Sequence, residues 1–217
     1  MCLADVGCGP GTIWSEAASS LPGKIMIHLG DLSMGMIAQA RKTLVTDHRF
    51  SFLELDAQSL PYPKNSLDAL TAFHMLYHVP DLPRAVSEFR RVIKPGGRLY
   101  AVTNGNDHMR ELYELIYRLI EVDEISHNVA EPRRFSLENA VEILQQEFDH
   151  VHVQRQENDL RVTEVVPLRN YILSMIPAAL RNERISVTEL DRKLGEIMEE
   201  QGGSIFITKA AGIAIAS

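Results

Sequence analysis

The chain has 217 residues, of which 45% are hydrophobic and 24% charged, and its formal net charge is −7. These are ordinary globular values, and a chain of this length buries roughly 70% of its unfolded surface, so it needs no disulfide or metal to hold a core. The acidic balance argues against nucleic acid as the main partner, because a phosphate backbone requires a clustered basic face. We expect no membrane span and no signal peptide, since no apolar run approaches about 20 residues. Cys2 and Cys8 match neither zinc nor disulfide spacing, which favours a reducing, cytoplasmic setting.

The first hundred residues alternate short apolar strands with helical patterns, which is typical of a parallel sheet covered by helices. The expected strands are 2–6, 24–29, 50–55, 67–73 and 98–103. Helices are expected over about 12–20, after a cap at Ser33, and over 81–93, where apolar residues recur at helical spacing. Lys94-Pro-Gly-Gly97 predicts a type II turn, and the pair Arg90-Arg91 is interpreted as a solvated helix face. These elements predict a doubly wound α/β domain.

The second half has a different character, with more helix and shorter strands. Helices are expected over 108–123, after a cap at Ser136, over 167–175, and from a capping box at Ser186-Val-Thr-Glu189 to Gly202-Gly203. Short strands are expected at 151–155 and 159–162, and one or two closing strands at 204–209 and 212–216. Because no repeat or linker interrupts the chain, we predict a single domain, 1–217, with a helical insertion at roughly 106–135.

A glycine-rich loop, Asp5-Val-Gly7-Cys8-Gly9-Pro10-Gly11-Thr12, directly follows the first expected strand. Glycine permits positive φ angles and lets a bound molecule lie against bare backbone. The helix that follows presents free N–H groups to a carboxylate or phosphate. A dinucleotide fingerprint would place a glycine at position 12, where this chain has Thr12. The alternative interpretation is a plain strand-to-helix turn, in which Cys8 is an unreactive loop residue.

Asp31 lies twenty residues beyond Gly11, at the expected end of the second strand. A carboxylate at this position can accept hydrogen bonds from both hydroxyls of a ribose, as in related nucleotide-binding folds. The alternative role is a helix cap, but Ser33 already suits that task. We therefore interpret Asp31 as a ribose ligand.

Asp56 closes the third expected strand and is followed by Ala57. Its carboxylate can accept a hydrogen bond from an exocyclic adenine amine, while Ala57 and Leu32 could pack on the ring faces. Taken alone, Asp56 would be a loop residue. Because Asp5, Asp31 and Asp56 follow three successive strands, they should meet at the carboxyl edge, where such sheets bind their ligands.

These residues, in this order and spacing, resemble the class I S-adenosylmethionine-dependent methyltransferases, and within them the small-molecule type. The resemblance covers residues 1 to about 105 and rests on DVGCGPG, GDLSMGMIAQAR, LDAQSLPYPKNSLDAL, FHMLYHVPDLPRAVSEFRRVIKPGG and RLYAVTNG. It implies a Rossmann-like, doubly wound, seven-stranded and mostly parallel sheet. The implied strand order is 3-2-1-4-5-7-6 with strand 7 antiparallel, and residues 204–216 fit that last strand.

The resemblance implies S-adenosyl-L-methionine as the cofactor. The loop glycines would lie close to its methionine part, and Asp31 would bind its ribose. Leu32 would pack against the face of its adenine, and Asp56 would contact the adenine edge. The complete set of implied cofactor residues is Asp5, Gly7, Cys8, Gly9, Gly11, Asp31, Leu32, Asp56, Ala57, Phe73 and His74. The implied reaction is in-line displacement of the methyl group, which positioning and the exclusion of water can accelerate without a dedicated base.

The sequence identifies no general base securely, and its candidates are His74, His78 and His108. The expected acceptor-pocket residues are Tyr77, Asn104, His108, Tyr113 and Tyr117, with the insertion as a lid over the acceptor. Packing of the tyrosines and of His78 is the alternative interpretation. No metal site is expected, because no carboxylate stands beside His74 and His78 in a zinc-protease pattern.

In the family, a segment of a few dozen residues usually precedes the first strand and covers the active site. Here Met1 lies four residues before Asp5, so either the sequence is truncated at its start or the acceptor pocket is unusually open. In both cases we expect cofactor binding to be better preserved than catalysis, and an uncovered apolar surface could promote self-association into a homo-oligomer. The expected acceptor is a small molecule, with no membrane as partner; the acidic balance and the helical insertion do not favour nucleic acid, although neither excludes a protein or tRNA acceptor. The alternatives are a non-catalytic S-adenosylmethionine-binding relative and a nicotinamide-dependent oxidoreductase, against which the glycine spacing counts.

Overall fold

The computed structural model describes residues 1–120, 133–176 and 186–217, which belong to two compact units. The first unit contains 1–106, 133–155 and 211–217, and the second contains the described residues of 107–132 and 156–210. The expected insertion, 106–135, therefore supplies only one of the two segments of the second unit. Its residues 121–132 lie outside the described residues, so the helix expected over 108–123 can be followed only to residue 120.

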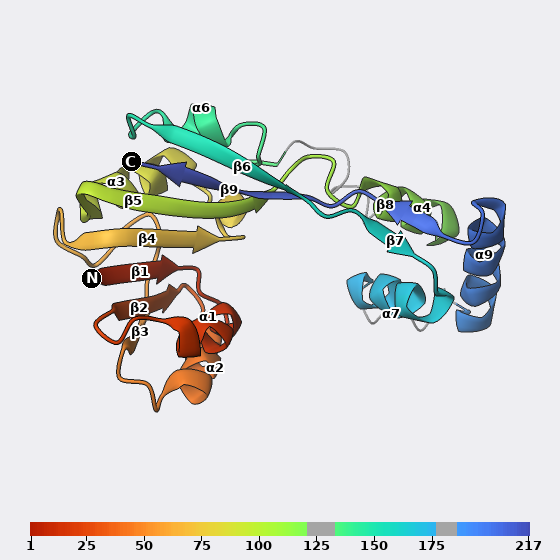
Figure 1. Cartoon of the computed structure of the whole chain (residues 1–217), viewed down its shortest axis with the longest axis horizontal. Helices are drawn as coiled ribbons and strands as arrows, with labels where there is room; N and C mark the ends of the chain where they lie inside the picture. The colour runs from red at the N-terminus through yellow and green to blue at the C-terminus, as the bar shows by residue number, and fades with distance from the viewer. Residues whose placement is uncertain (121–132, 177–185) are drawn as a thin grey trace. The chain divides into compact units, whose positions relative to one another are not determined.

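The first unit is built on a seven-stranded sheet with the order β3-β2-β1-β4-β5-β9-β6 (Figure 1). The strands are β1 Cys2–Val6, β2 Met26–Asp31, β3 Phe50–Glu54, β4 Leu67–Phe73, β5 Ile93–Asn104, β6 Val151–Glu157 and β9 Ala210–Ala216. The first five pair in parallel, whereas β9 is antiparallel to β5. This confirms the predicted Rossmann-like sheet, with β9 in the position of the expected antiparallel strand 7.

Among the parallel strands, β2 and β5 differ most from the sequence prediction. Strand β2 begins and ends two residues later than expected, so Asp31 is its last residue. Strand β5 begins at Ile93 rather than Arg98, because Lys94–Gly97 forms an irregularity in the β4–β5 pairing rather than a separate turn. Gly96 keeps the positive φ, 80°, that a turn at this point requires. Strand β5 thus pairs with β4 on both sides of a segment whose local sequence predicts a turn.

The helices of the first unit are α1 Thr12–Ala17, a 3-10 turn at Ala18–Ser20, α2 Met34–Leu44, a 3-10 turn at Leu76–His78, α3 Leu82–Val92 and α6 Ala140–Leu144. Ser33 caps α2 as predicted, since its hydroxyl accepts from the N–H of Met36. The predicted cap at Ser136 is wrong, because α6 begins after Asn139. The Asn139 side chain accepts from the Ser136 N–H over 2.7 Å, which bends residues 136–139 into a turn before the helix.

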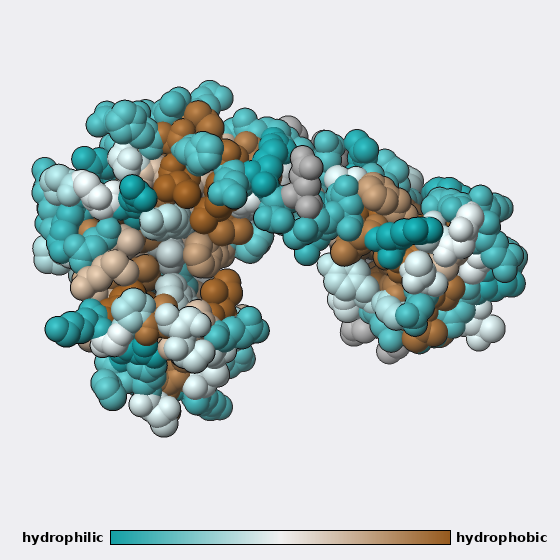
Figure 2. Space-filling model, in the orientation of Figure 1, coloured by the Kyte–Doolittle hydropathy of each residue, from teal (hydrophilic) through white to brown (hydrophobic). Residues whose placement is uncertain are grey.

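Helices cover both faces of the parallel strands, so those strands are nearly continuous apolar runs, as in β4 with Leu70 and Ala72 fully buried. One core cluster joins the sheet to α3 through Phe89, and a second joins it to the α1 side through Trp14 and Ile27. On the visible face of the protein, brown hydrophobic residues lie among a mainly teal hydrophilic surface (Figure 2). The helices cover the faces of the sheet but not the carboxyl ends of its strands. The loops that follow these ends can therefore contact a ligand.

The second unit has a hydrophobic core of its own. It contains α4 Arg110–Ile120, α7 Val165–Met175, α9 Val187–Glu200 and a two-stranded ribbon of β7 Leu160–Val162 with β8 Ile205–Ile207. Ser186 caps α9 as predicted, accepting from the N–H of Glu189. Of the two expected closing strands, only β9 joins the main sheet, while β8 pairs with β7. In the described part of the chain, no helix is both long and apolar enough to cross a membrane.

Candidate active site at the carboxyl edge of the sheet

The glycine-rich loop leaves β1 at Val6 and is tied at once to the neighbouring strand. The N–H groups of Gly7 and Cys8 both donate to the carbonyl of Gly30, over 2.8 and 2.9 Å. Gly7, Gly9 and Gly11 have φ values of 74°, 56° and 75°, the left-handed region in which glycine carries no steric penalty. The loop therefore needs glycine at all three positions of its G-x-G-x-G pattern.

The three glycines face different surroundings. A Cβ atom on Gly7 would lie 2.7 Å from the side chain of Met75, and one on Gly11 would lie 3.1 Å from Ala40. A Cβ on Gly9 would meet nothing within 4 Å. Packing thus explains the small residues at positions 7 and 11, whereas Gly9 presents bare backbone to open space, which a ligand can approach closely.

Asp31, the last residue of β2, joins the loop to that strand. Its Oδ2 accepts from the N–H of Gly9 and its Oδ1 from the N–H of Ser33, each over 2.9 Å. An ionised carboxylate has about four acceptor sites, so two remain for hydroxyl groups of a ligand. The next side chain, Leu32, is 70% exposed. A hydrogen-bond acceptor and an uncovered apolar side chain therefore stand together beside the loop.

Asp5 lies beneath the loop and is 3% exposed. It pairs in register with Thr71 of β4, whose hydroxyl donates to Oδ1 over 2.6 Å, and the indole N–H of Trp14 donates to Oδ2 over 2.7 Å. Burial raises the pKa of Asp5 to about 6, although both hydrogen bonds act to lower it. With both oxygens engaged by protein donors, Asp5 holds β1, β4 and α1 together under the loop.

Cys8 lies within the loop and its thiol donates to the carbonyl of Gly9 over 3.4 Å. Burial, reinforced by the negative charges of Asp5 and Asp31, raises the pKa of Cys8 to about 12. The thiol therefore stays protonated at neutral pH and is a poor nucleophile. This agrees with its interpretation as an unreactive residue.

Asp56 follows β3 at the same edge. Its Oδ1 accepts from the backbone N–H of Gln58 over 2.9 Å and from the side-chain amide of Gln58 over 3.0 Å. These hydrogen bonds lower the pKa of Asp56, so it stays ionised at neutral pH. Ala57 is buried, at 6% exposed. Of Asp56 and Ala57, Asp56 is thus the partly buried residue whose carboxylate can accept a hydrogen bond from a ligand.

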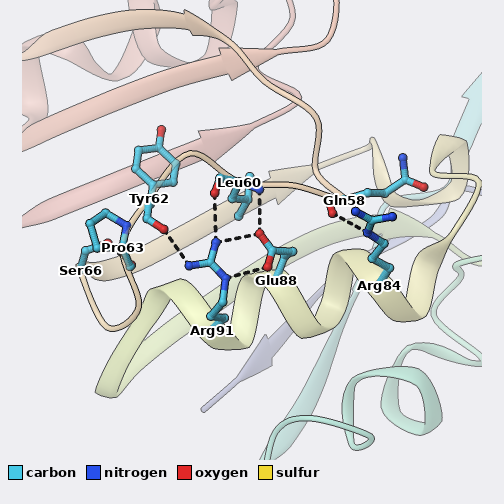
Figure 3. A network of polar contacts seen from close by, with 8 residues as sticks. All are labelled: Gln58, Leu60, Tyr62, Pro63, Ser66, Arg84, Glu88 and Arg91. Atoms are coloured by element: carbon cyan, nitrogen blue, oxygen red, sulfur yellow. Dashed lines mark hydrogen bonds and ion pairs between the residues drawn. The ribbon is translucent and has the colours of Figure 1, made fainter.

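The sequence interpretation missed the polar network that fixes this loop to α3 (Figure 3). The Arg84 guanidinium donates to the carbonyl of Gln58 over 2.9 Å. Arg91 donates to both carboxylate oxygens of Glu88 and to the carbonyls of Leu60 and Tyr62, over 2.6 to 3.0 Å. The interpretation of Arg91 as a solvated residue is therefore wrong. Its guanidinium donates to the carbonyls of Tyr62 and Leu60, which lie 29 and 31 residues away in sequence.

Phe73 ends β4 and His74 follows it, with the His74 N–H donating to the carbonyl of Val102 over 2.9 Å. His74 has a φ of 53°, which is uncommon for a residue other than glycine and is found at functional sites. Burial, with a smaller contribution from the positive charge of Arg133, lowers the pKa of His74. Its imidazole is therefore neutral at pH 7 and able to accept a proton.

Other predicted residues of the first unit lie at the same edge. Tyr77 and His78 belong to the short 3-10 turn after His74, and their ring centroids are 4.5 Å apart. The Arg133 guanidinium lies 5.8 Å from the centroid of the Tyr77 ring. Asn104 ends β5 and its carbonyl accepts from the N–H of Leu137. The first unit thus gathers the loop, three strand-end acids, an imidazole and a tyrosine at the carboxyl edge.

His108, Tyr113 and Tyr117 belong to the second unit. Tyr113 packs against the core of that unit, while Tyr117 is 53% exposed. His108 lines a cavity of the second unit. Among the described residues, no three His, Cys, Asp or Glu side chains are grouped to hold a metal ion. The role of these three residues at an acceptor pocket stays a prediction.

Comparisons with known proteins agree with this geometry. Residues 4–101 match the family described as a methyltransferase domain. A demethylmenaquinone methyltransferase from Clavibacter sepedonicus is 36% identical over 97 residues, which are 45% of this chain and 38% of that protein. The segments shared with this and other curated relatives span 20% to 51% of those proteins' own length.

Solved structures share the fold over nearly the whole chain. The YcgJ protein from Bacillus subtilis has a TM-score of 0.62 at 19% identity, covering 99% of this chain and 90% of that one. Phosphoethanolamine N-methyltransferase 2 of Haemonchus contortus, solved in complex with S-adenosyl-L-methionine, has a TM-score of 0.61 at 19% identity and covers 100% of this chain and 48% of that one. Residues 4–101 are thus similar to a methyltransferase domain, and the seven-stranded sheet has the Rossmann-like fold of these solved structures.

Proposed function

We propose that this protein binds S-adenosyl-L-methionine at the glycine-rich loop and transfers its methyl group to a small-molecule acceptor. The observation that carries this proposal is the coupling of the loop to Asp31, whose carboxylate accepts from the N–H of Gly9 and keeps lone pairs for a ligand. The coupling fixes bare backbone and an anionic acceptor in one place. A ligand with a ribose and an amino acid part needs both features.

The residues present fit this cofactor. Gly9 leaves open space at the loop, and its neighbours Gly7 and Gly11 hold the turn. Asp31 can accept from the ribose hydroxyls, and the exposed Leu32 can cover one face of the adenine. Asp56, kept ionised by Gln58, can accept from the adenine amine. These hydrogen-bond acceptors match the hydroxyls of the sugar and the amine of the base, and the carboxylates of Asp31 and Asp56 do not repel a sulfonium.

When bound, the cofactor supplies a methyl group attached to a neutral leaving group. The chain's own task is to orient the acceptor opposite the sulfur and to exclude water. His74 is neutral at pH 7 and can accept a proton from an acceptor O–H or N–H at a ring nitrogen. Tyr77, the middle residue of the 3-10 turn, and Asn104, the last residue of β5, are the first-unit residues that we assign to the acceptor.

The proposed acceptor class follows from the relatives and from the charge of the chain. The Clavibacter sepedonicus relative is a demethylmenaquinone methyltransferase, which supports a small molecule as acceptor. The net charge of −7 does not favour a nucleic-acid acceptor. The predicted helical insertion, 106–135, is proposed to contribute to the acceptor side.

The test is a calorimetric titration of the chain with S-adenosylmethionine, S-adenosylhomocysteine and NAD. We expect binding of the first two and none of NAD. Asp31→Ala should weaken binding by about 1–3 kcal/mol, the usual loss for hydrogen bonds to a charged group. Glu54→Gln, at the exposed end of the neighbouring strand β3, is the matched control and should leave the affinity unchanged.

The outcomes separate the alternatives. NAD binding without S-adenosylmethionine binding would favour a nicotinamide-dependent oxidoreductase. S-adenosylmethionine binding without S-adenosylhomocysteine formation across a panel of phenolic, quinol and amine acceptors would favour a non-catalytic relative. Binding of neither ligand would contradict the proposed site.

A further inference from the structure

The second unit contains a cavity of about 350 Å³. Its walls come from the start of α4, from α7, from β7, and from β8 with the segment that follows it. Eight of the ten lining residues are apolar or aromatic: Met109, Leu112, Leu160, Val162, Pro167, Leu168, Tyr171 and Ile207. The other two are His108 and Lys209. This volume and composition are those of a small-molecule site, which is typically 300–1,000 Å³ and mainly apolar with few polar groups.

The apolar wall of the cavity results from the two-residue period of the β7–β8 ribbon. Leu160 pairs with Ile207, and Val162 with Ile205, so these four side chains share one face. Arg161 and Phe206 pair on the other face. Leu160, Val162 and Ile207 line the cavity, whereas Phe206 is 55% exposed on the opposite side. The ribbon thus directs one of its faces to the cavity.

The rim of the cavity is fixed by hydrogen bonds that do not involve a ligand. Glu111 accepts from both the N–H and the hydroxyl of Thr208, each over 2.8 Å, and Asp159 accepts from the N–H of Lys209 over 2.9 Å. The N–H of Met109 donates to the carbonyl of Thr208, which holds Met109 at a φ of 61°. A cavity with such a rim is preformed, so a ligand need not order it on binding.

The apolar surface of this unit extends to the rim. Leu160 is 38% exposed and Tyr171 is 50% exposed, although both line the cavity. Brown hydrophobic residues are visible on this part of the protein in Figure 2. Water against such side chains is displaced favourably by an apolar ligand. The rim therefore allows an elongated molecule to enter with its end still in contact with solvent.

Lys209 supplies the ammonium group among the lining residues, while the nearby carboxylates of Glu111 and Asp159 are engaged by the N–H and hydroxyl donors of Thr208 and Lys209. Within the described part of the chain it forms no ion pair. Its ammonium group on a flexible stem can reach an anionic end group of a ligand that lies in the cavity. We infer that this cavity binds the apolar chain of a small amphipathic acid, with its carboxylate or phosphate end at Lys209.

This inference does not rest on the proposed methyl transfer, because every residue that it uses belongs to the second unit. The probe is therefore dodecanoate, titrated into the full chain without S-adenosylmethionine and below its micellar concentration. Binding is followed by calorimetry and by the methyl NMR signals of Leu112, Val162 and Ile207. Dodecanol is the matched neutral probe. We expect saturable, single-site binding of dodecanoate with shifts confined to the cavity methyls.

Two variants test the apolar wall at positions where the fold should tolerate change. Tyr171→Ala removes a cavity side chain that is half-exposed, and should weaken dodecanoate binding about tenfold through lost apolar burial. Val166→Ala removes an exposed apolar side chain of the same helix that does not line the cavity. It should leave the affinity unchanged. Equal effects of the two substitutions, or no saturable binding by the unmodified chain, would overturn the inference.

One variant tests the charged rim. Lys209→Met should weaken dodecanoate binding about tenfold, as expected for loss of a charge-assisted hydrogen bond, and leave dodecanol binding unchanged. An equal effect on both probes would show that the site does not recognise an acidic end group, and would refute that half of the inference. Stronger binding of inorganic phosphate than of dodecanoate would refute the role of the apolar wall.

Discussion

The indole N–H of Trp14 donates to Oδ2 of Asp5 over 2.7 Å in the buried interior beneath the glycine-rich loop. Thr71 satisfies the other carboxylate oxygen. One side chain thus connects the strand before the loop, the helix after it and the adjacent strand β4. Any change in the ionisation of Asp5 acts on all three elements that support the loop.

We predict that the Asp5 carboxyl makes the free energy of unfolding depend on pH between about pH 4 and 6. Its folded-state pKa of about 6 lies above the 3.8 of an unperturbed aspartate, so the folded protein binds more protons than the unfolded chain between about pH 4 and 6. The contribution of Asp5 is fully favourable below this window and is lost as pH rises through it. The difference amounts to about 2–3 kcal/mol.

The measurement is urea unfolding from pH 4 to 7, for the unmodified chain and for Asp5→Asn. The free-energy difference between the two should change across the window, because asparagine does not titrate. Trp14→Phe removes a hydrogen bond that lowers the pKa of Asp5, so it should move the window to higher pH. Parallel pH profiles for the unmodified chain and Asp5→Asn would show that this carboxyl has an ordinary pKa.

Gly30 is required by packing against Leu55 rather than by its backbone angles. A Cβ at Gly30 would overlap the Leu55 side chain, with Cγ 2.5 Å away. Gly30→Ala should therefore lower the free energy of unfolding by about 1–3 kcal/mol, as overpacking does. Leu55→Ala made in the same chain should cancel part of that loss, which a double-mutant cycle would measure. Gly23→Ala, where a Cβ meets nothing within 4 Å, is the control and should be close to neutral.

Arg91 and Arg90 are adjacent in sequence but should differ in effect. Arg91→Lys loses the planar fork that binds Glu88 and two loop carbonyls, so we expect a loss of about 1–3 kcal/mol in unfolding free energy. Arg90 makes one long hydrogen bond, to Ile93 over 3.5 Å, and Arg90→Lys should change stability by about 0.5 kcal/mol or less. Equal losses in chemical denaturation would mean that the network in Figure 3 is not stabilising.

His74 offers a test that separates its side chain from its backbone. Asparagine tolerates left-handed φ values better than alanine, so His74→Asn should be less destabilising than His74→Ala, by about 1 kcal/mol. Both variants remove the imidazole, and both should weaken S-adenosylmethionine binding in calorimetry. Unchanged affinity in both, together with unchanged turnover, would make His74 a structural residue only.

The elements that the sequence predicted well depend on local signals. The glycine positions, the apolar runs and the caps at Ser33 and Ser186 are readable from neighbouring residues, because each is determined by φ preferences and by hydrogen bonds within a few positions. The order of the parallel strands followed from the family resemblance that these signals carry. The same signals placed the glycine-rich loop, Asp31 and Asp56 at one edge, since the carboxyl ends of parallel strands coincide.

What depends on distant partners was decided only by the tertiary structure. The sequence did not show that Arg91 supports loop carbonyls about 30 residues away, or that Asp5 is held by Trp14 and Thr71. It also did not show that β8 pairs with β7 in a separate ribbon, outside the main sheet, and that this ribbon forms part of the cavity wall. A buried backbone or side-chain polar group needs a hydrogen-bond partner, and which partner it meets depends on which distant segments fold against it. The local sequence therefore determines which elements form, and the tertiary structure decides which of their groups meet.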